Sequence, residues 1–255
     1  MDTRRLSEPK RPPSAEAATL GEPSYVWRSG QERRLQLIRR YVRLEGAWIL
    51  DVGCGIGTYV QRFAELTAHP YGIDVSLERL RQARAKGLTR VLAAAGERLP
   101  FSDRSFDVVV FNEVIEHVAD DRQAIADALR VLRPGGHVVI YAPNRLFPFE
   151  THGVYWRGRY VYGNIPAVNY LPNQMRNRLV PHARAYTAGG ITKLWLGFPC
   201  RPIVHTYVYP GFDNVAARNP AAGRYLRAAL YRAERTPMRR FGLSHFVVLQ
   251  KREEA

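Results

Sequence analysis

A glycine-rich turn with an acid just ahead of it is the first stretch whose residues could do chemistry. Asp51 precedes three alternate glycines, Gly53, Gly55 and Gly57. Alternate glycines let the backbone turn tightly and approach a ligand closely, where a Cβ atom would collide. Asp74 ends the next apolar run, at a position where a carboxylate suits the two hydroxyls of a ribose. These residues predict a nucleotide-like ligand at the turn.

A second stretch places two carboxylates and an imidazole close together. Glu113, Glu116 and His117 are spaced i, i+3 and i+4, so a helical turn would put all three on one face. Such groups can bind a divalent cation. His117 could instead act as a general base or simply pack, and His152 is the rival candidate for ligand or base.

The elements that must position these residues alternate between strands and helices. Apolar runs predict strands over residues 48–52, 69–75, 90–94, 106–111 and 137–142. Helical patterns cover residues 31–44, 58–66, 76–86 and 120–132. Two late strands, 202–209 and 245–251, are expected as an antiparallel edge pair. The alternation predicts an α/β fold with a doubly wound seven-stranded sheet whose last strand is antiparallel.

Two features separate the glycine turn from one that binds a dinucleotide. The glycine spacing is G-x-G-x-G rather than G-x-G-x-x-G, and Asp51 stands where a pyrophosphate would be repelled. An acid at this point can instead meet a cationic amino-acid ligand. The segment resembles motif I of the class I S-adenosylmethionine-dependent methyltransferases, which have a Rossmann-like fold.

This resemblance continues in family order through Leu99–Phe101, Phe106–Val110 and Leu132–Gly136, and covers roughly residues 30–145. It implies S-adenosyl-L-methionine as the cofactor. Relatives often carry an acid for the adenine amino group where this chain has Ala95, so a neighbouring backbone N–H or Glu97 is expected to serve. The residues that the resemblance assigns to the cofactor are Asp51, Gly53, Cys54, Gly55, Asp74, Val75, Gly96, Glu97 and Asn112.

The E-x-x-E-H stretch is similar to the metal-binding motif of ubiquinone-pathway O-methyltransferases and of small-RNA 2′-O-methyltransferases. Those relatives have a further histidine ahead of the next helix, where this chain has His182. The resemblance therefore implies a Mg²⁺ site formed by Glu113, Glu116, His117 and His182. Without a metal ion, His117 or His152 would be the general base.

Composition limits the class of protein. The chain has 255 residues with 46% hydrophobic content, enough for one sizeable core. Residues 1–23 are charged and proline-rich and are predicted to be a mobile tail, followed by a methyltransferase domain over residues 24–255. Two cysteines and the lack of an 18-residue apolar run predict a cytoplasmic protein, with peripheral contact to a membrane as a further option.

The net charge of +15 is concentrated in the C-terminal part, where residues 151–255 hold 16 basic and 4 acidic side chains. Arginine accounts for 34 of the 38 basic residues. A genome that favours arginine codons explains the arginine-to-lysine ratio but not the asymmetry. An anionic partner, whether a substrate, RNA or an acidic membrane surface, explains the asymmetry. Both explanations remain open.

Two insertions extend the minimal fold. Residues 143–186 follow the fifth strand, are rich in aromatic residues, and are expected over the active site, either as a lid or as a small core of their own. Residues 210–243 separate the last two strands. Their segment Ala221–Arg235 reads as an arginine-rich helix that lies on an anionic membrane or packs in the ordinary way.

The function expected from these features is O-methylation of a small hydroxylated acceptor, lipidic, quinone-like or anionic. The aromatic insertion and the lack of a recognisable RNA-binding appendage favour a small molecule over RNA. The alternatives are an RNA 2′-O-methyltransferase and a non-catalytic module that binds the cofactor. No feature indicates a stable protein partner.

Overall fold

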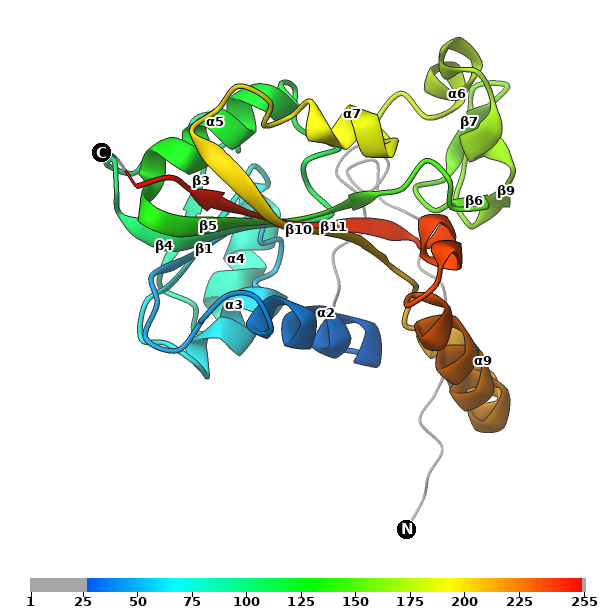
Figure 1. Cartoon of the computed structure of the whole chain (residues 1–255), viewed down its shortest axis with the longest axis horizontal. Coiled ribbons are helices and arrows are strands. Elements are labelled where there is room, and N and C mark those ends of the chain that lie inside the picture. Colours follow the sequence, from blue (N-terminus) through cyan, green and yellow to red (C-terminus); the bar gives the residue numbers. More distant parts are fainter. Residues whose placement is uncertain (1–26, 254–255) are drawn as a thin grey trace.

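The computed structural model describes residues 27–253, which form a seven-stranded sheet with helices on both faces (Figure 1). The predicted tail, residues 1–23, lies outside this range. The strand order is β10-β11-β5-β4-β1-β2-β3, and β11 is antiparallel to both of its neighbours. Strands β5, β4, β1, β2 and β3 are parallel to one another. The predicted Rossmann-like α/β fold with an antiparallel last strand is confirmed.

The elements of this core lie close to their predicted places. Its strands are β1 (Ile49–Val52), β2 (Pro70–Asp74), β3 (Val91–Ala93), β4 (Phe106–Asn112), β5 (Leu132–Pro143), β10 (Cys200–Val208) and β11 (Ser244–Lys251). Its helices are α2 (Ser29–Arg39), α3 (Thr58–Ala64), α4 (Leu77–Ala85), α5 (Asp121–Val131) and α7 (Ala188–Thr192).

Two predicted boundaries were wrong by about five residues. The first helix ends at Arg39 rather than at residue 44, and Val42 and Leu44 are buried from the turn that follows it. The fifth strand begins at Leu132 rather than at residue 137, because Leu132 already pairs with Phe106. The Pro-Gly-Gly segment therefore lies inside β5, where the pairing with β4 changes register.

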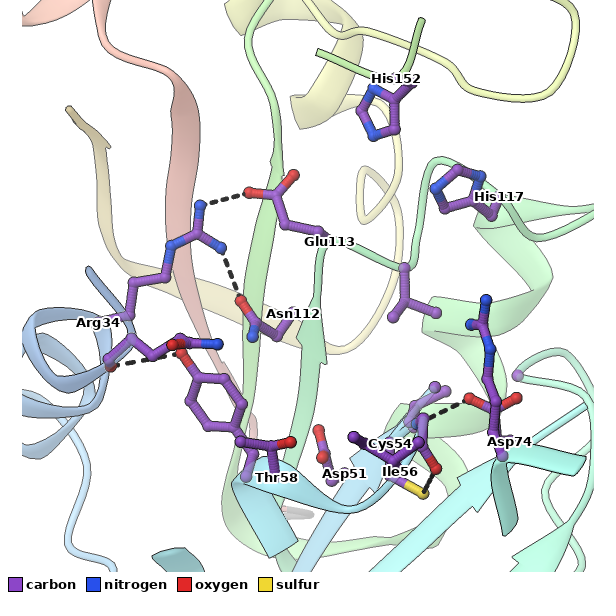
Figure 2. Close-up of a pocket in the computed structure, with 18 of the residues that line it drawn as sticks. Arg34, Asp51, Cys54, Ile56, Thr58, Asp74, Asn112, Glu113, His117 and His152 are labelled. Carbon is purple, nitrogen blue, oxygen red and sulfur yellow. Dashed lines mark hydrogen bonds and ion pairs between the residues drawn. The ribbon is translucent and has the colours of Figure 1, made fainter. Parts of the chain in front are cut away.

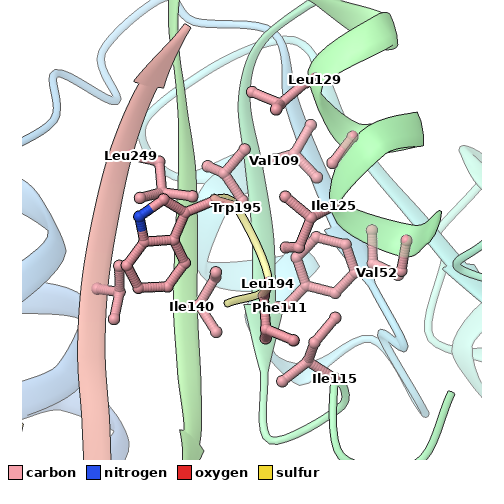
Figure 3. Close-up of a cluster of buried hydrophobic side chains, with 14 of the residues drawn as sticks. Val52, Val109, Phe111, Ile115, Ile125, Leu129, Ile140, Leu194, Trp195 and Leu249 are labelled. Atoms are coloured by element: carbon pink, nitrogen blue, oxygen red, sulfur yellow. The ribbon is translucent and has the colours of Figure 1, made fainter. Parts of the chain in front are cut away.

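Alternate residues of the central strands pack on opposite faces of the sheet, as the period of a strand requires. On β4, Val109 and Phe111 belong to the cluster that α5 and Trp195 cover (Figure 3). Val108 and Val110 face the opposite cluster, under α2 and α3. Each fully buried side chain of this size contributes about 1.5–3 kcal/mol, so both helical layers stabilise the same rigid strands. The strands hold their carboxyl ends, where the site lies, in fixed positions.

The helices that follow β2 and β4 begin at side-chain caps. The Ser76 hydroxyl accepts a hydrogen bond from the Arg79 amide at 3.2 Å, as expected of an N-cap. The Asp120 carboxylate accepts one from the Gln123 amide at 2.9 Å. The Ser76 cap comes two residues after the end of β2, and the Asp120 cap eight residues after the end of β4, and each fixes where its helix begins.

The first insertion is a small unit with its own core. It contains the strand pairs β6 (Phe149–Glu150) with β9 (Ile165–Pro166) and β7 (Val154–Trp156) with β8 (Arg159–Val161), then η1 (Val168–Tyr170) and α6 (Asn173–Leu179). Its core is aliphatic, formed by Val154, Val168, Val180 and Ala183. At its centre the buried Arg176 binds Glu150 at 2.6 Å and the carbonyl of Ala183 at 2.9 Å.

The second insertion forms α8 (Asp213–Arg218), α9 (Pro220–Ala233) and the 3₁₀ helix η2 (Pro237–Phe241). α9 projects away from the body of the molecule, at the same end as the first insertion (Figure 1). It lies close to the predicted helix over residues 221–235. Among residues 27–253, no helix has both the length and the apolar character needed to cross a bilayer.

Replacing Arg176 with alanine is expected to loosen the first insertion without unfolding the sheet. The substitution leaves the Glu150 carboxylate buried without its cation, and breaking such a buried pair costs about 3–5 kcal/mol. Hydrogen exchange should accelerate over residues 147–183 and stay unchanged in β1, β4 and β5. The matched control is Arg178→Ala, which removes an exposed neighbour on the same helix. Equal exchange in the two variants would contradict the assigned role of Arg176.

Candidate active site

A cavity of about 670 Å³ opens at the carboxyl ends of β1, β2 and β4. The glycine turn and the acids at the ends of β1 and β2 form one side, as Figure 2 shows. A second side of the cavity is formed by α2 together with the two ends of the second insertion. Thr151, His152, Tyr160, Tyr162 and His182 come from the first insertion. All nine residues predicted to bind the cofactor line this single cavity.

The glycine turn has the backbone that its sequence predicts. Gly53, Gly55 and Gly57 all have positive φ, at 71°, 56° and 80°. A Cβ at Gly53 would lie 2.4 Å from a methyl group of Val114, so any larger residue would displace the segment that carries Glu116 and His117. The turn is therefore restricted to glycine by both conformation and space.

Two buried carboxylates lie beside the turn. Asp74 accepts hydrogen bonds from the amides of Gly55 and Ser76, each at 2.8 Å, so it also holds the turn in place. Asp51 is 3% exposed. Burial, and secondarily the charge of Asp74, raises the pKa of Asp51 to about 8. A cationic ligand group in the cavity would offset the repulsion between these two carboxylates. The amino group of an amino-acid ligand is such a cation, whereas a pyrophosphate is an anion.

The thiol of Cys54, within the turn, packs under the sheet edge against Val60 and Leu80. Burial raises the pKa of this thiol well above its usual range, which makes it a packing group and not a nucleophile. Glu97 was expected near the adenine. Its Oε1 atom accepts a hydrogen bond from the amide of Ala119, at 2.5 Å. The backbone around Ala95 and Gly96 remains the nearer candidate for the adenine contact, and both residues line the cavity.

Arg34 is a cavity residue that the sequence did not single out. From α2 it reaches across the cavity and donates to Asn112 at 2.8 Å, to Glu113 at 2.7 Å and to Ser244 at 2.9 Å (Figure 2). It therefore joins α2 to the ends of β4 and β11. The only signal in the sequence was an amphipathic helix rich in arginine, which does not say which arginine turns inward.

The predicted helical turn over residues 113–117 is not a helix. Glu113 adopts a positive φ of 57°, which turns its side chain toward Arg34 and away from Glu116. The charge of Arg34 overcomes the effect of burial and holds the pKa of Glu113 below its usual range. The assumption that Glu113, Glu116 and His117 share one face was therefore wrong, because β4 ends in a left-handed residue instead of leading into a helix.

Glu116, His117 and His152 come together instead. One ligand atom from each lies within 4.8 Å of the others. Nε2 of His152 is 3.5 Å and Nε2 of His117 is 3.9 Å from the same oxygen of Glu116. The Glu116 carboxylate is 1% exposed, and within residues 27–253 neither of its oxygens has a hydrogen-bond donor. A buried carboxylate without a hydrogen-bond donor needs a compensating cation nearby, which can be a protonated histidine or a metal ion.

The two histidines differ in protonation. Burial lowers the pKa of His117, and its Nδ1 faces the carbonyl of His182 at 2.8 Å. Nδ1 therefore carries the proton and Nε2 keeps a lone pair. Burial alone would lower the pKa of His152. The carboxylates of Glu116 and Glu150 outweigh this effect and raise the pKa of His152 to about 10. His152 is a cation at neutral pH, whereas His117 is a neutral base.

His182 stands beside this group rather than in it. Its Nε2 contacts the carbonyl of His152 at 3.0 Å, and its Nδ1 has no partner within the described residues. Its ring centroid lies 6.5 Å from that of His152. The ring of His182 thus orders the segment that carries His152, while its carbonyl sets the tautomer of His117.

The first insertion has a core of its own and also contributes residues to the cavity wall. Its core is separate, and Tyr160 and Tyr162 line the cavity. Its other aromatic residues include Trp156 and Tyr170, which are exposed on the outer surface. Of the aromatic residues predicted to form a lid, only some therefore face the cavity.

Comparison with known proteins agrees with this geometry. Residues 50–140 match the family described as a methyltransferase domain. A ubiquinone biosynthesis O-methyltransferase of Alkalilimnicola ehrlichii is 40% identical over 108 residues, which are 40% of this chain and 44% of the relative. One of Hydrogenovibrio crunogenus is 27% identical over 180 residues, 68% of this chain and 74% of the relative. In seven curated relatives the match spans about half of their length or less.

Solved structures show the same fold. An S-adenosylmethionine-dependent methyltransferase from Mesorhizobium loti superposes with a TM-score of 0.60 at 18% identity, over 85% of this chain and 96% of that one. The order of the motifs, the seven-stranded sheet with its antiparallel last strand, and the matched residues 50–140 all agree. The family match identifies residues 50–140 as a methyltransferase domain, and the solved structure agrees with it in fold.

Proposed function

We propose that this protein transfers a methyl group from S-adenosyl-L-methionine to the hydroxyl of a small acceptor. The observation that carries the proposal is that a neutral imidazole nitrogen, Nε2 of His117, shares one cavity with the acid pair Asp51 and Asp74. The acid pair fits a cationic, ribose-bearing cofactor. The imidazole fits an acceptor that must lose a proton.

The residues that would hold the cofactor are those of the glycine turn, with Asp51 toward its amino-acid end and Asp74 toward its ribose. When bound, S-adenosyl-L-methionine supplies an electrophilic methyl group on a sulfonium. Each oxygen of Asp74 already accepts one backbone hydrogen bond and keeps a further lone pair for a hydroxyl. The two carboxylates thus match both polar ends of the ligand without further rearrangement.

The protein's own contribution to the reaction is alignment and proton removal. Nε2 of His117 accepts the proton of the acceptor hydroxyl as the oxygen attacks. The imidazolium that forms is stabilised by the Glu116 carboxylate, 3.9 Å from the same nitrogen. Tyr160 and Tyr162 line the cavity on the side of the first insertion, which we assign to the acceptor. His152, already protonated, is unsuited to the role of base that it shared with His117 in the sequence analysis.

A small acceptor is favoured over RNA because the first insertion covers the cavity beside the proposed base. RNA 2′-O-methylation and a cofactor-binding module without turnover remain the alternatives that experiment can separate. Names of relatives point in the same direction, since the curated matches include ubiquinone biosynthesis O-methyltransferases. The acceptor class proposed is therefore a hydroxylated ring or an amphiphile.

The same cavity offers a candidate site for a divalent cation, at Glu116, His117 and His152. The orphaned Glu116 carboxylate and the two imidazole nitrogens fit such an ion. The predicted set of Glu113, Glu116, His117 and His182 is replaced, because Arg34 binds Glu113 and the ring of His182 lies outside the group. One carboxylate with two imidazoles suits Mn²⁺ better than the predicted Mg²⁺. A bound ion would occupy the lone pair of His117 and replace it as the group that activates the acceptor, by supplying Lewis acidity at the acceptor oxygen.

The pH dependence of cofactor binding tests the acid pair. Because the pKa of Asp51 is about 8 without ligand, a cationic ligand that favours the ionised carboxylate must release a proton when it binds below pH 8. S-adenosylhomocysteine should therefore bind more tightly as pH rises from 6 to 8, with proton release seen by calorimetry in buffers of different ionisation enthalpy. Asp51→Asn should abolish both effects. A pH-independent affinity for the wild type would refute the role of Asp51.

Turnover tests the function and the base together. With radiolabelled S-adenosylmethionine and a series of phenols, His117→Gln should lower kcat by roughly 10²–10⁴-fold and leave S-adenosylhomocysteine binding unchanged. The loss should shrink for more acidic phenols, which need less help with their proton. Since the pKa of His117 is lowered below 6.5, wild-type activity should persist at pH values where an ordinary histidine is protonated. Methylation of RNA but of no phenol or lipid quinol would favour the alternative.

The cation site predicts a binding isotherm that shifts with pH. A divalent ion must displace the proton of His152, whose pKa is about 10, so affinity for Mn²⁺ should rise about tenfold from pH 7 to pH 8. Loss of the free-ion electron paramagnetic resonance signal measures this without turnover, with Mg²⁺ as competitor. His152→Gln should abolish binding, and the control His182→Gln should retain it. Full activity in excess chelator would leave His117 as the base without a metal ion.

A further inference from the structure

We propose that the rim of the cavity docks on an anionic lipid bilayer. The rim consists of the two insertions, residues 143–186 and 210–243. This inference extends the proposed function, because it concerns where the protein works rather than the methyl transfer itself. It rests on the charge, the exposed apolar side chains and the position of the rim.

The rim carries most of the chain's excess positive charge. The two insertions together contain thirteen arginines, no lysine and only three acids. Each of the three acids is neutralised within the structure: Glu150 by Arg176, Asp213 by Arg227, and Glu234 by Arg33. The remaining arginines therefore present a field that no neighbouring carboxylate of the rim offsets.

The positive charge faces outward on the second insertion. No acid is exposed between residues 214 and 241 of the described chain. The arginines exposed there are Arg218, Arg224, Arg232, Arg235, Arg239 and Arg240. An anionic lipid surface attracts such residues within a Debye length.

Large apolar side chains lie among these arginines. Tyr225 on α9 is 78% exposed, and Met238 and Phe241 on η2 are exposed beside Arg239 and Arg240. On the first insertion Trp156 is 57% exposed at the tip of the β7–β8 hairpin. Exposed aromatic residues interleaved with arginine are typical of segments that lie in the headgroup region of a membrane.

The rim surrounds the entrance of the cavity. Pro210 and Leu243, at the two ends of the second insertion, line the cavity, as do Tyr160 and Tyr162 of the first. In Figure 1 both insertions project at the same end of the sheet. Docking of the rim would therefore bring the cavity to the bilayer surface, from which an amphiphilic acceptor could enter.

The shape of the surface favours a bilayer over RNA. Proteins that bind single-stranded nucleic acid combine a positively charged groove with aromatic residues on which bases stack. Here the charges lie on a helix that stands out from the body, and the cavity at the strand ends is lined by no residue of α9. A projecting amphipathic surface suits a flat interface.

Vesicle co-sedimentation tests the proposal with the wild-type chain, without cofactor or acceptor. Binding to phosphatidylglycerol–phosphatidylcholine vesicles should be strong at low salt, weaken steeply at 0.5 M NaCl, and be absent for pure phosphatidylcholine. Each arginine near an anionic surface contributes about fivefold. Arg224→Glu with Arg232→Glu should therefore lower the binding constant at least about 25-fold. The control with the same change in charge is Arg40→Glu with Arg43→Glu, two exposed arginines between α2 and β1 that lie outside both insertions, which should keep at least half of the affinity.

Trp156 gives an independent readout of contact. The other tryptophans of the described chain are buried or partly buried, so a blue shift of the emission on adding anionic vesicles would report Trp156. Trp156→Phe should abolish the shift and keep most of the binding. Absence of sedimentation at low salt, or equal weakening by the control pair, would overturn the proposal. So would an RNA gel shift sensitive to the α9 pair without any vesicle binding. None of these outcomes depends on methyl transfer, so they leave the proposed function to its own test.

Discussion

The burial of two like charges at the ends of neighbouring strands is the constraint on which the site depends. β1 and β2 are parallel and adjacent, so Asp51 and Asp74 end at the same edge of the sheet. In a low-dielectric cavity both carboxylates cannot stay ionised without compensation. Without a ligand the protein compensates through a proton on Asp51, and a cationic ligand can replace that proton. The glycine turn lies between the two acids, and the amide of Gly55 donates a hydrogen bond to Asp74.

Arginine–carboxylate ion pairs hold α2 and the first insertion in place around the sheet. Arg34 joins α2 to β4 and β11, and Arg176 holds the core of the first insertion. Such pairs contribute little net stability compared with a well-packed apolar core, but they are costly to break once buried. They specify one arrangement of segments that are far apart in sequence. The cavity wall therefore consists largely of residues whose places are set by ion pairs, whereas the sheet beneath it is set by packing.

Much of the fold was predictable because its signals are local. The apolar runs, the Ser76 and Asp120 caps and the glycine turn each depend on a few consecutive residues. The geometry of residues 113–117 was not predictable, because a remote residue, Arg34, holds Glu113 in its left-handed conformation. For the same reason the sequence named Glu116 and His117 but not their grouping with His152, which depends on how residues 143–186 fold back over β4. The residues assigned to the cofactor lie at strand ends, which local sequence signals indicate. Those on the acceptor side lie in the insertions, whose folding local signals do not indicate.

The contacts between α2 and the second insertion have a consequence for communication across the molecule. Asp213 accepts hydrogen bonds from Ser29 and Gly30 at the start of α2, and Arg33 pairs with Glu234 at the end of α9. These contacts tie α2, which lines the cavity, to α9, which bears the exposed arginines. If occupancy of the cavity stiffens α2, it stiffens the lipid-facing helix as well, and thermodynamic reciprocity then requires the surface to strengthen ligand binding by the same factor. The interface would act as an effector of the enzyme as well as the place where it works.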